Sequence, residues 1–208
     1  MLQPMAPRRP AALRHLALLL ALLAPAGAFA HEGASLPYGS FLGGLLHPVL
    51  GPDHFLAMVS VGILSAQIGG RAIWTVPATF VGVMFLGGVY GWLGLPLASI
   101  EIGIAFSVLT LGAAIAAERR VPVAIAMLFV GTFAIFHGYA HGAEMPDVAN
   151  PVTYALGFVS GTAGLHLAGV VIGDIAQHYA PGKVMLRAAG GVIAAFGVYF
   201  MLAATGIV

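Results

Sequence analysis

The chain of 208 residues has no cysteine, and charged residues make up only 7% of it. The absence of cysteine excludes disulfide bridges and thiolate metal sites, so any metal chemistry must rest on His, Asp, Glu or Met side chains. The scarcity of charge leaves no basic patch of the kind that binds nucleic acid. It also excludes an ordinary soluble domain, in which about a quarter of the residues are charged.

Apolar residues dominate instead. They account for 60% of the sequence, and the mean hydropathy is +1.00. Such a composition is typical of a polytopic membrane protein. Apolar stretches of spanning length, separated by short breaks rich in turn formers or charges, predict six transmembrane helices. Their expected bounds are 38–68, 72–94, 97–117, 121–143, 151–176 and 185–207. The predicted fold class is therefore an all-α integral membrane protein.

Residues 1–30 have the pattern of a secretory signal peptide. Arginines precede an apolar run over 16–23, and Ala28-Phe29-Ala30 forms a small-x-small cleavage site. We expect cleavage after Ala30, which leaves 31–208 as one six-helix transmembrane domain. His31 would then be the new N-terminus, where its α-amine and imidazole could chelate a metal together. The alternatives are an uncleaved signal anchor and, for His31, an ordinary polar leader.

The first predicted span is longer than the roughly 20 residues that a helix needs to cross the hydrocarbon. It contains Pro48, Gly51 and Pro52. Proline removes a backbone donor and disfavours helical geometry just before it. We therefore expect a tilted or broken helix here, and a simple proline kink is the alternative.

The basic residues of the mature chain follow the first, third and fifth spans. They are Arg71, Arg119, Arg120, Lys183 and Arg187. The positive-inside rule places these loops in the cytoplasm. We therefore expect a multi-pass protein of the cytoplasmic (inner) membrane of a bacterium, with an exported N-terminus.

Six ionisable side chains lie inside the apolar stretches, where each is energetically unfavourable and indicates a functional site. They are His47, Asp53, His54, His137, His141 and His166. Glu144 extends the spacing of His137 and His141, so a helix would align these three along one stripe. Imidazoles combined with carboxylates suit a divalent transition metal. A lone buried histidine is often only a hydrogen-bonded strut between helices, but two paired sets make a metal pathway the favoured interpretation.

A rise of 1.5 Å per residue predicts that these candidate ligands lie at successive depths below the outer face. Glu144, His141 and His31 would lie at the mouth, His137 and His47 deeper, then His54, and His166 toward the cytoplasm. Several modest sites along a path allow an ion to bind and leave, which indicates permeation. The paired ligands occur in the first and fourth spans, which cross the membrane in opposite directions. This arrangement suggests a 3+3 inverted repeat.

At these motifs the chain resembles the HupE/UreJ family of nickel permeases. The resemblance is carried by His47-Pro48-x-x-Gly51-x-Asp53-His54, by Phe136-His137-Gly138-x-x-His141-Gly142-x-Glu144-x-Pro146, and by Gly157-Phe158 through Thr162 to Leu165-His166. It implies six transmembrane helices, an exported N-terminus and uptake of Ni²⁺ or Co²⁺ for hydrogenase or urease maturation. It also implies that His47, Asp53 and His54 are transport ligands, with His137, His141 and Glu144 beside them. The wider nickel/cobalt permease superfamily has four residues between the histidine and the Asp-His pair, whereas five intervene here.

No glycine-rich phosphate loop ending in Lys-Ser/Thr is present, so we expect secondary or passive transport and no enzymatic activity. The expected partners are the divalent ion and the lipid bilayer, without a permanent cofactor and without nucleic acid. A homo-oligomer is left open. The alternative function is a membrane redox protein with bis-histidine haem, using His47, His137 and His166. An intramembrane metal-dependent hydrolase with Asp53 or Glu144 as base is a weaker alternative, as is a metal receptor that does not transport.

Overall fold

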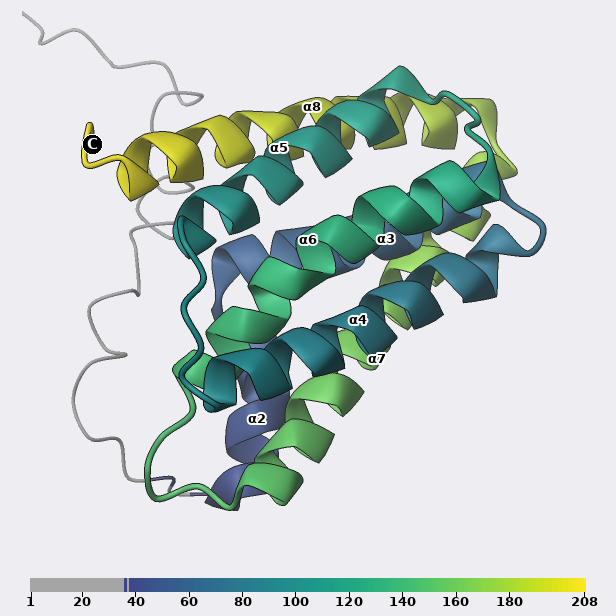
Figure 1. Cartoon of the computed structure of the whole chain (residues 1–208). Coiled ribbons are helices and arrows are strands. Elements are labelled where there is room, and N and C mark those ends of the chain that lie inside the picture. Colours follow the sequence, from purple (N-terminus) through teal and green to yellow (C-terminus); the bar gives the residue numbers. More distant parts are fainter. Residues whose placement is uncertain (1–35, 37) are drawn as a thin grey trace, which may run out of the picture. The chain divides into compact units, whose positions relative to one another are not determined.

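The computed structural model describes residue 36 and residues 38–208. Within them the chain forms seven helices and no strand, which confirms the all-α prediction (Figure 1). The helices are α2 (Gly39–Leu50), α3 (Pro52–Ile68), α4 (Ala72–Trp92), α5 (Ile100–Ala117), α6 (Val123–Ala143), α7 (Pro151–Gln177) and α8 (Ala180–Ala204). The predicted signal peptide, its cleavage site and His31 lie outside the described residues.

Five of these helices, α4 to α8, are long and apolar enough to cross a membrane singly. Helices α2 and α3 meet this requirement only together, and they are bent by 80° at the break between them. Counting the bent pair as one span gives the six that the sequence predicts.

The break lies at Gly51, whose backbone is extended at φ −79° and ψ 110°. Its N–H donates to the His47 carbonyl and closes α2, and Pro52 begins α3 at a position where a missing donor does no harm. The expected broken helix is thus confirmed, and the alternative of a simple kink is wrong. The break places the end of α2 and the first turn of α3 close together.

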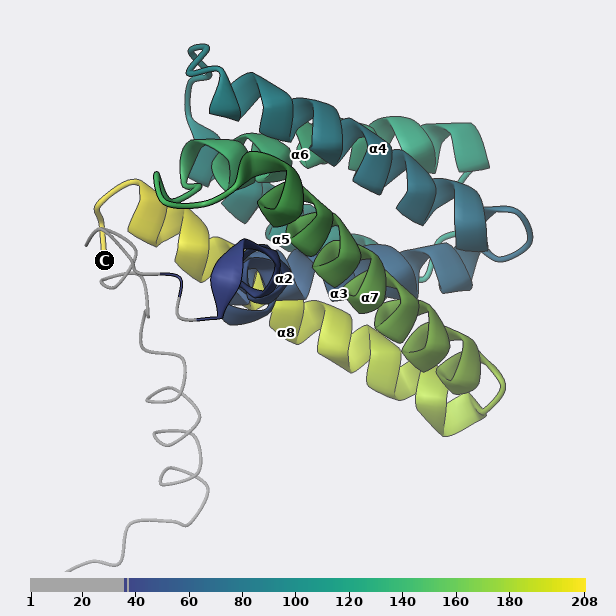
Figure 2. The same cartoon turned by 90° about the horizontal axis from the view of Figure 1, so that it is seen from below.

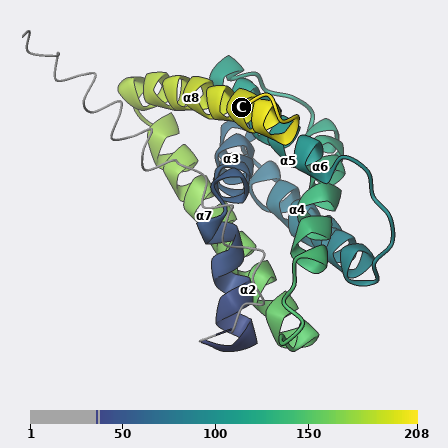
Figure 3. The ribbon, with the colours of Figure 1, turned by 90° about the vertical axis from the view of Figure 1, so that its left-hand side faces the viewer.

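Helix α3 forms the centre of the bundle and contacts each of the other helices described here (Figures 1 and 3). Eleven of its 17 residues are buried, including His54, Ser60, Ser65 and Gln67. Large apolar side chains cover the outside of the bundle instead, as on the lipid-facing sides of α4, α6 and α7. Polar side chains are thus buried in the middle of the bundle while large apolar ones cover its outside, as expected where a bilayer is the solvent.

The remaining helices pack in pairs, α4 with α6 and α5 with α8, while α7 runs along both α2 and α3 (Figure 2). Glycines allow the closest approaches. A Cβ at Gly138 or Gly142 of α6 would overlap backbone carbonyls of α4, and a Cβ at Gly62 of α3 would overlap the His166 carbonyl of α7. Small residues at such contacts let membrane helices pack backbone to backbone.

The pattern of helix pairs bears on the predicted inverted repeat. In such a repeat the pair α2 and α3 corresponds to α6, α4 corresponds to α7, and α5 corresponds to α8. The packing of α2 and α3 on α7 then corresponds to the packing of α6 on α4, and the packing of α5 on α8 corresponds to itself. The contact between α3 and α5 has no counterpart of similar extent between α6 and α8. The repeat therefore stays a prediction.

The loops after α3, α5 and α7 lie at one end of the helical body, on the right in Figure 1. These loops and the start of α8 contain all five basic residues within 38–208. The start of α3 and the last turns of α6 lie toward the opposite end, and these segments contain most of the candidate metal ligands.

Candidate metal site

Three histidines from three helices converge where the first span is broken. One ring nitrogen of each of His47, His54 and His141 lies within 4.8 Å of the others. The ring centroids are 4.7 Å apart for His47 and His141, 5.0 Å for His54 and His141, and 5.9 Å for His47 and His54. We call these three residues the outer histidine cluster. Three converging imidazoles can bind a single transition-metal ion.

The sequence predicted these three residues at successive depths, and the structure differs. That prediction counted along straight helices, whereas the 80° bend between α2 and α3 turns the start of α3 back toward the end of α2. His47 and His54 therefore lie close to each other and to His141. The outer part of the expected path is a cluster.

Asp53 fixes the orientation of His54. Its Oδ1 accepts a hydrogen bond from the His54 backbone N–H at 2.7 Å and lies 3.0 Å from His54 Nδ1. An ionised carboxylate only accepts, so Nδ1 carries the ring proton and Nε2 is left with a free lone pair. That Nε2 is buried without a hydrogen-bond partner. A carboxylate behind a histidine in this way orients a metal ligand and makes it more basic.

Ser107 of α5 has the same effect on His137, whose ring centroid lies 4.7 Å from that of His54. The Ser107 hydroxyl donates its proton to the Ile104 carbonyl at 2.6 Å. Its oxygen, 2.9 Å from His137 Nε2, must therefore accept from that nitrogen. His137 Nδ1 is consequently unprotonated, and it is buried without a partner. A fourth imidazole thus adjoins the outer histidine cluster with a free lone pair.

His47 lies on the more open side of the cluster. Its Nε2 is 3.4 Å from Glu144 Oε2, and its Nδ1 is hydrogen-bonded to the Tyr154 hydroxyl at 3.1 Å. Burial by itself raises the pKa of Glu144, but the contact with His47 outweighs it and leaves this pKa below its usual 4.5. The Glu144 side chain is 44% exposed and that of His47 24%. This side therefore offers an ionised carboxylate to an approaching cation.

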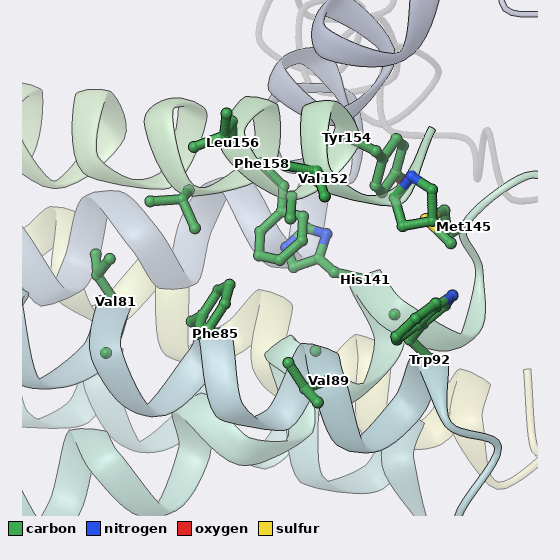
Figure 4. Close-up of a pocket in the computed structure, with 16 residues that line it drawn as sticks. Val81, Phe85, Val89, Trp92, His141, Met145, Val152, Tyr154, Leu156 and Phe158 are labelled. Carbon is green, nitrogen blue, oxygen red and sulfur yellow. The ribbon is translucent and has the colours of Figure 1, made fainter. Parts of the chain in front are cut away.

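His141 is fully buried, and both of its ring nitrogens lack partners. Its ring stacks on Phe158 with centroids 4.8 Å apart. It also borders a cavity of about 600 Å³ between α4 and α7, whose other lining residues are apolar or aromatic (Figure 4). Besides His141, only the Met145 thioether and the Tyr154 hydroxyl could offer an ion a ligand there. The ionised and part-exposed Glu144 makes its side of the cluster the more attractive one for a cation.

His166 of α7 lies outside the outer histidine cluster. It is buried, and both ring nitrogens lack a partner. Its ring packs edge-on against Phe80 at 5.1 Å, and Phe80 in turn lies 5.6 Å from His137. Of the seven predicted ligands within the described residues, six gather around the break in the first span, and His166 is separate.

Sequence reasoning did not identify four neighbours of the candidate ligands. These are Ser107, Tyr154, Phe158 and Phe80. Tyr154 and Phe158 precede His166 by 12 and 8 residues, which are multiples of four. This helical spacing could have indicated that they line the same side of the helix as His166. Ser107 and Phe80 carry no such signal because neither has a sequence relation to the histidine that it contacts.

Comparisons with known proteins agree with the motifs. A family model with the description HupE / UreJ protein matches residues 18–200. Protein HupE of Rhizobium leguminosarum bv. viciae is 42% identical over 179 residues, which cover 86% of this chain and 92% of that protein. No solved structure matches. The range matched by the family model contains every residue of the outer histidine cluster.

Proposed function

Because this chain belongs to the HupE/UreJ family, we propose that it carries a divalent transition-metal ion, nickel first and cobalt second, across the bacterial cytoplasmic membrane. Members of the family are membrane-bound transport or accessory proteins, associated with nickel or cobalt uptake or with hydrogenase and urease, and are not known as enzymes. The apolar helices make this chain a multi-pass membrane protein. The exported N-terminus, the choice of ion and the mode of transport belong to the proposal.

The observation that carries the proposal is the number of free imidazole nitrogens at one place. His54 Nε2, His137 Nδ1 and both nitrogens of His141 are buried without hydrogen-bond partners. Buried polar groups in proteins are nearly always paired, because an unpaired one costs free energy. Each of these three imidazoles therefore has a free lone pair that a metal ion could satisfy.

We assign the transport ligands accordingly. His47, His54, His137 and His141 would bind the ion in turn, Asp53 would hold His54 in its binding tautomer, and Glu144 would attract the ion at the open side. Each imidazole must be neutral to bind, so uptake depends on pH. His166 would receive the ion deeper in the bundle.

The alternative of bis-histidine haem is disfavoured by the packing of the rings. The centroids of His47 and His141, and those of His54 and His137, are only 4.7 Å apart. Of the predicted haem ligands, His47 and His137 are thus already in contact with other imidazoles, and the Phe80 ring packs against both His137 and His166, which leaves no open space for a porphyrin plane. The spacing suits a small ion that several imidazoles share.

Transport would be secondary or passive. A divalent ion that moves down a membrane potential of about 100 mV gains roughly 4.6 kcal/mol, because each charge contributes about 2.3 kcal/mol. Charge alone could therefore concentrate the ion inside the cell. Polar groups at the access side would replace its hydration water in steps.

The direct test is uptake of ⁶³Ni²⁺ into proteoliposomes under an inside-negative potential, for the parent and for His54→Ala. We expect saturable uptake by the parent and a loss of more than about tenfold in the variant, since a ligand is at least as important as the group that orients it. Competition with Co²⁺, Cu²⁺, Zn²⁺ and Mg²⁺ ranks the ions. His178→Ala is the matched control, because His178 is an exposed imidazole at the end of α7.

Two results would count against the proposal. If uptake by the parent is no faster than uptake by empty liposomes, the protein does not transport Ni²⁺. Normal uptake by His54→Ala would show that the ion does not pass through the outer histidine cluster.

A further inference from the structure

One face of α7 leads from the outer histidine cluster into the middle of the bundle. Tyr154, Phe158, Thr162 and His166 are spaced by four residues and all are buried. Residues at this spacing share one helix face. Tyr154 hydrogen-bonds His47, and Phe158 stacks on His141. His166 lies eight residues beyond Phe158, which is about 12 Å further along the helix.

A matching face of α4 runs beside it in the opposite direction. A Cβ at Gly88 would contact the Phe158 ring at 3.1 Å. One turn earlier in α4, Met84 Sδ accepts a hydrogen bond from the Thr162 hydroxyl at 3.5 Å. The next turn brings Phe80 against His166. The two faces thus pack against each other from the outer histidine cluster to His166.

His166 lies at the inner end of these two faces as an unsatisfied polar group. Neither ring nitrogen has a partner, and the ring is 98% buried because only 2% of the residue is exposed. The imidazole does not serve as a hydrogen-bonded strut between helices, which would be the ordinary reason for a buried histidine. Its neighbourhood also holds the Met84 thioether and the Thr162 hydroxyl on the adjoining turns.

Phe80 contacts this imidazole and one of the others. The ring is fully buried and its centroid lies 5.6 Å from that of His137 and 5.1 Å from that of His166. His137 itself adjoins His54. The Phe80 ring therefore contacts both His137, the last imidazole of the outer group, and the separate imidazole of His166. An apolar ring at this point blocks water and charge.

Building on the proposed function, we propose that His166 is a second ion-binding station and that the Phe80 ring is the barrier which an ion must pass between His137 and His166. Imidazole and thioether groups favour a borderline or soft divalent ion over Mg²⁺ or Ca²⁺. The barrier would keep the two stations from connecting through a continuous water column. A rotation of the Phe80 side chain would let the ion cross.

Equilibrium binding of Ni²⁺ to the full chain in lipid nanodiscs tests the second station. We expect the parent to bind two ions and His166→Leu to bind one, with the affinity of the outer histidine cluster unchanged. Leucine is apolar and of similar size, so a packing role would be preserved in this variant. Saturable ⁶³Ni²⁺ uptake should fall by more than about tenfold. His178→Leu is the matched control on the same helix.

The station is disproved if His166→Leu binds as many ions as the parent and transports them as fast. That result would leave the proposed function intact, because the parent would still transport Ni²⁺ and His54→Ala would still fail. If His166→Leu does not give a monodisperse protein, His166→Gln is measured in the same way. An amide keeps a polar group at the position but is a poor ligand for nickel.

Changes to the size of the Phe80 side chain test the barrier. We expect Phe80→Trp to slow uptake severalfold while Ni²⁺ binding to the outer histidine cluster stays normal. Phe80→Ala should speed uptake severalfold and admit Mg²⁺, whereas we expect the parent to exclude it. Phe106→Ala is the control, because Phe106 is an exposed ring on α5. If both Phe80 variants take up Ni²⁺ at the parent's rate and with the parent's selectivity against Mg²⁺, Phe80 is not a barrier.

Discussion

The outer histidine cluster and His166 use the same side chain but position it by different means. Around the cluster, polar side chains fix the rings: Asp53 bonds His54, and Ser107 bonds His137. Each bond also decides which ring nitrogen is free to bind an ion. Nearby carboxylates are part-exposed, so an ion can meet these histidines while it still keeps some of its water.

His166 has no polar partner, and packing alone holds it. Its ring rests on Phe80, and its backbone carbonyl faces Gly62 of α3. The difference indicates that the outer region can be weakened in steps by removing single hydrogen bonds. Ion binding at His166 should instead be lost only when the packing of the surrounding helices is disrupted.

The largest expected effect comes from Gly62→Leu. A Cβ at this position already overlaps the His166 carbonyl, so a leucine would force α3 and α7 apart. Overpacking of this kind destabilises proteins by about 1–3 kcal/mol or more. We expect little monodisperse protein by size-exclusion chromatography in detergent.

Gly164→Leu is the matched control, since Gly164 lies on α7 with open space at its Cβ position. It should leave the chromatographic profile unchanged. Equal behaviour of the two variants would show that close backbone approach does not hold His166.

The next largest effect is expected from Asp53→Asn. An amide can donate to His54 Nδ1, which would favour the tautomer with its proton on Nε2, the nitrogen now free to bind. Loss of a carboxylate that orients a metal-binding histidine lowers affinity by about 10–100-fold. Titration with Ni²⁺ should show this loss without a change in fold. Asp174→Asn, at an exposed position on α7, should bind as the parent does.

Ser107→Ala should have a smaller effect on Ni²⁺ binding at the outer histidine cluster. The variant leaves the His137 ring N–H without its acceptor, which costs about 1–3 kcal/mol for a buried group. We expect a lower melting temperature and a decrease in Ni²⁺ affinity of up to about tenfold. Ser107→Thr keeps the hydroxyl and should restore affinity. Ser160→Ala removes an exposed hydroxyl that bonds only within its own helix, so it should change neither quantity.

The sequence predicted much of this region. The apolar stretches indicated the spans, and the Gly51-Pro52 step indicated the break because neither residue favours a continuous helix there. Asp53 is next to His54 in the chain, so their pairing required no knowledge of the fold. Contacts between side chains can be predicted from the sequence where the interacting residues are neighbours in the chain.

The remainder depends on helix pairing, which the sequence does not encode locally. Ser107 is one hydroxyl in an apolar helix, and its role follows only from the contact of α5 with α6. Phe80 is one of 12 phenylalanines, and nothing in its neighbours along the chain distinguishes it. The clustering of His47, His54 and His141 was not foreseen for a related reason, since it depends on the 80° bend between α2 and α3.

The smallest expected effect concerns Glu144 at the open side of the outer histidine cluster. Its pKa in the folded protein is lowered, so the ionised carboxylate stabilises the fold above its usual pKa of 4.5, and this stabilisation is lost as the pH falls through the lowered value. Comparing melting temperatures of the parent and Glu144→Gln should therefore show a parent advantage at pH 6 that shrinks below pH 4.5. The advantage should be small because water screens a side chain that is 44% exposed. Glu118→Gln serves as the control at the other end of the bundle, and an advantage that grows on acidification would show that the carboxylate is not held by His47.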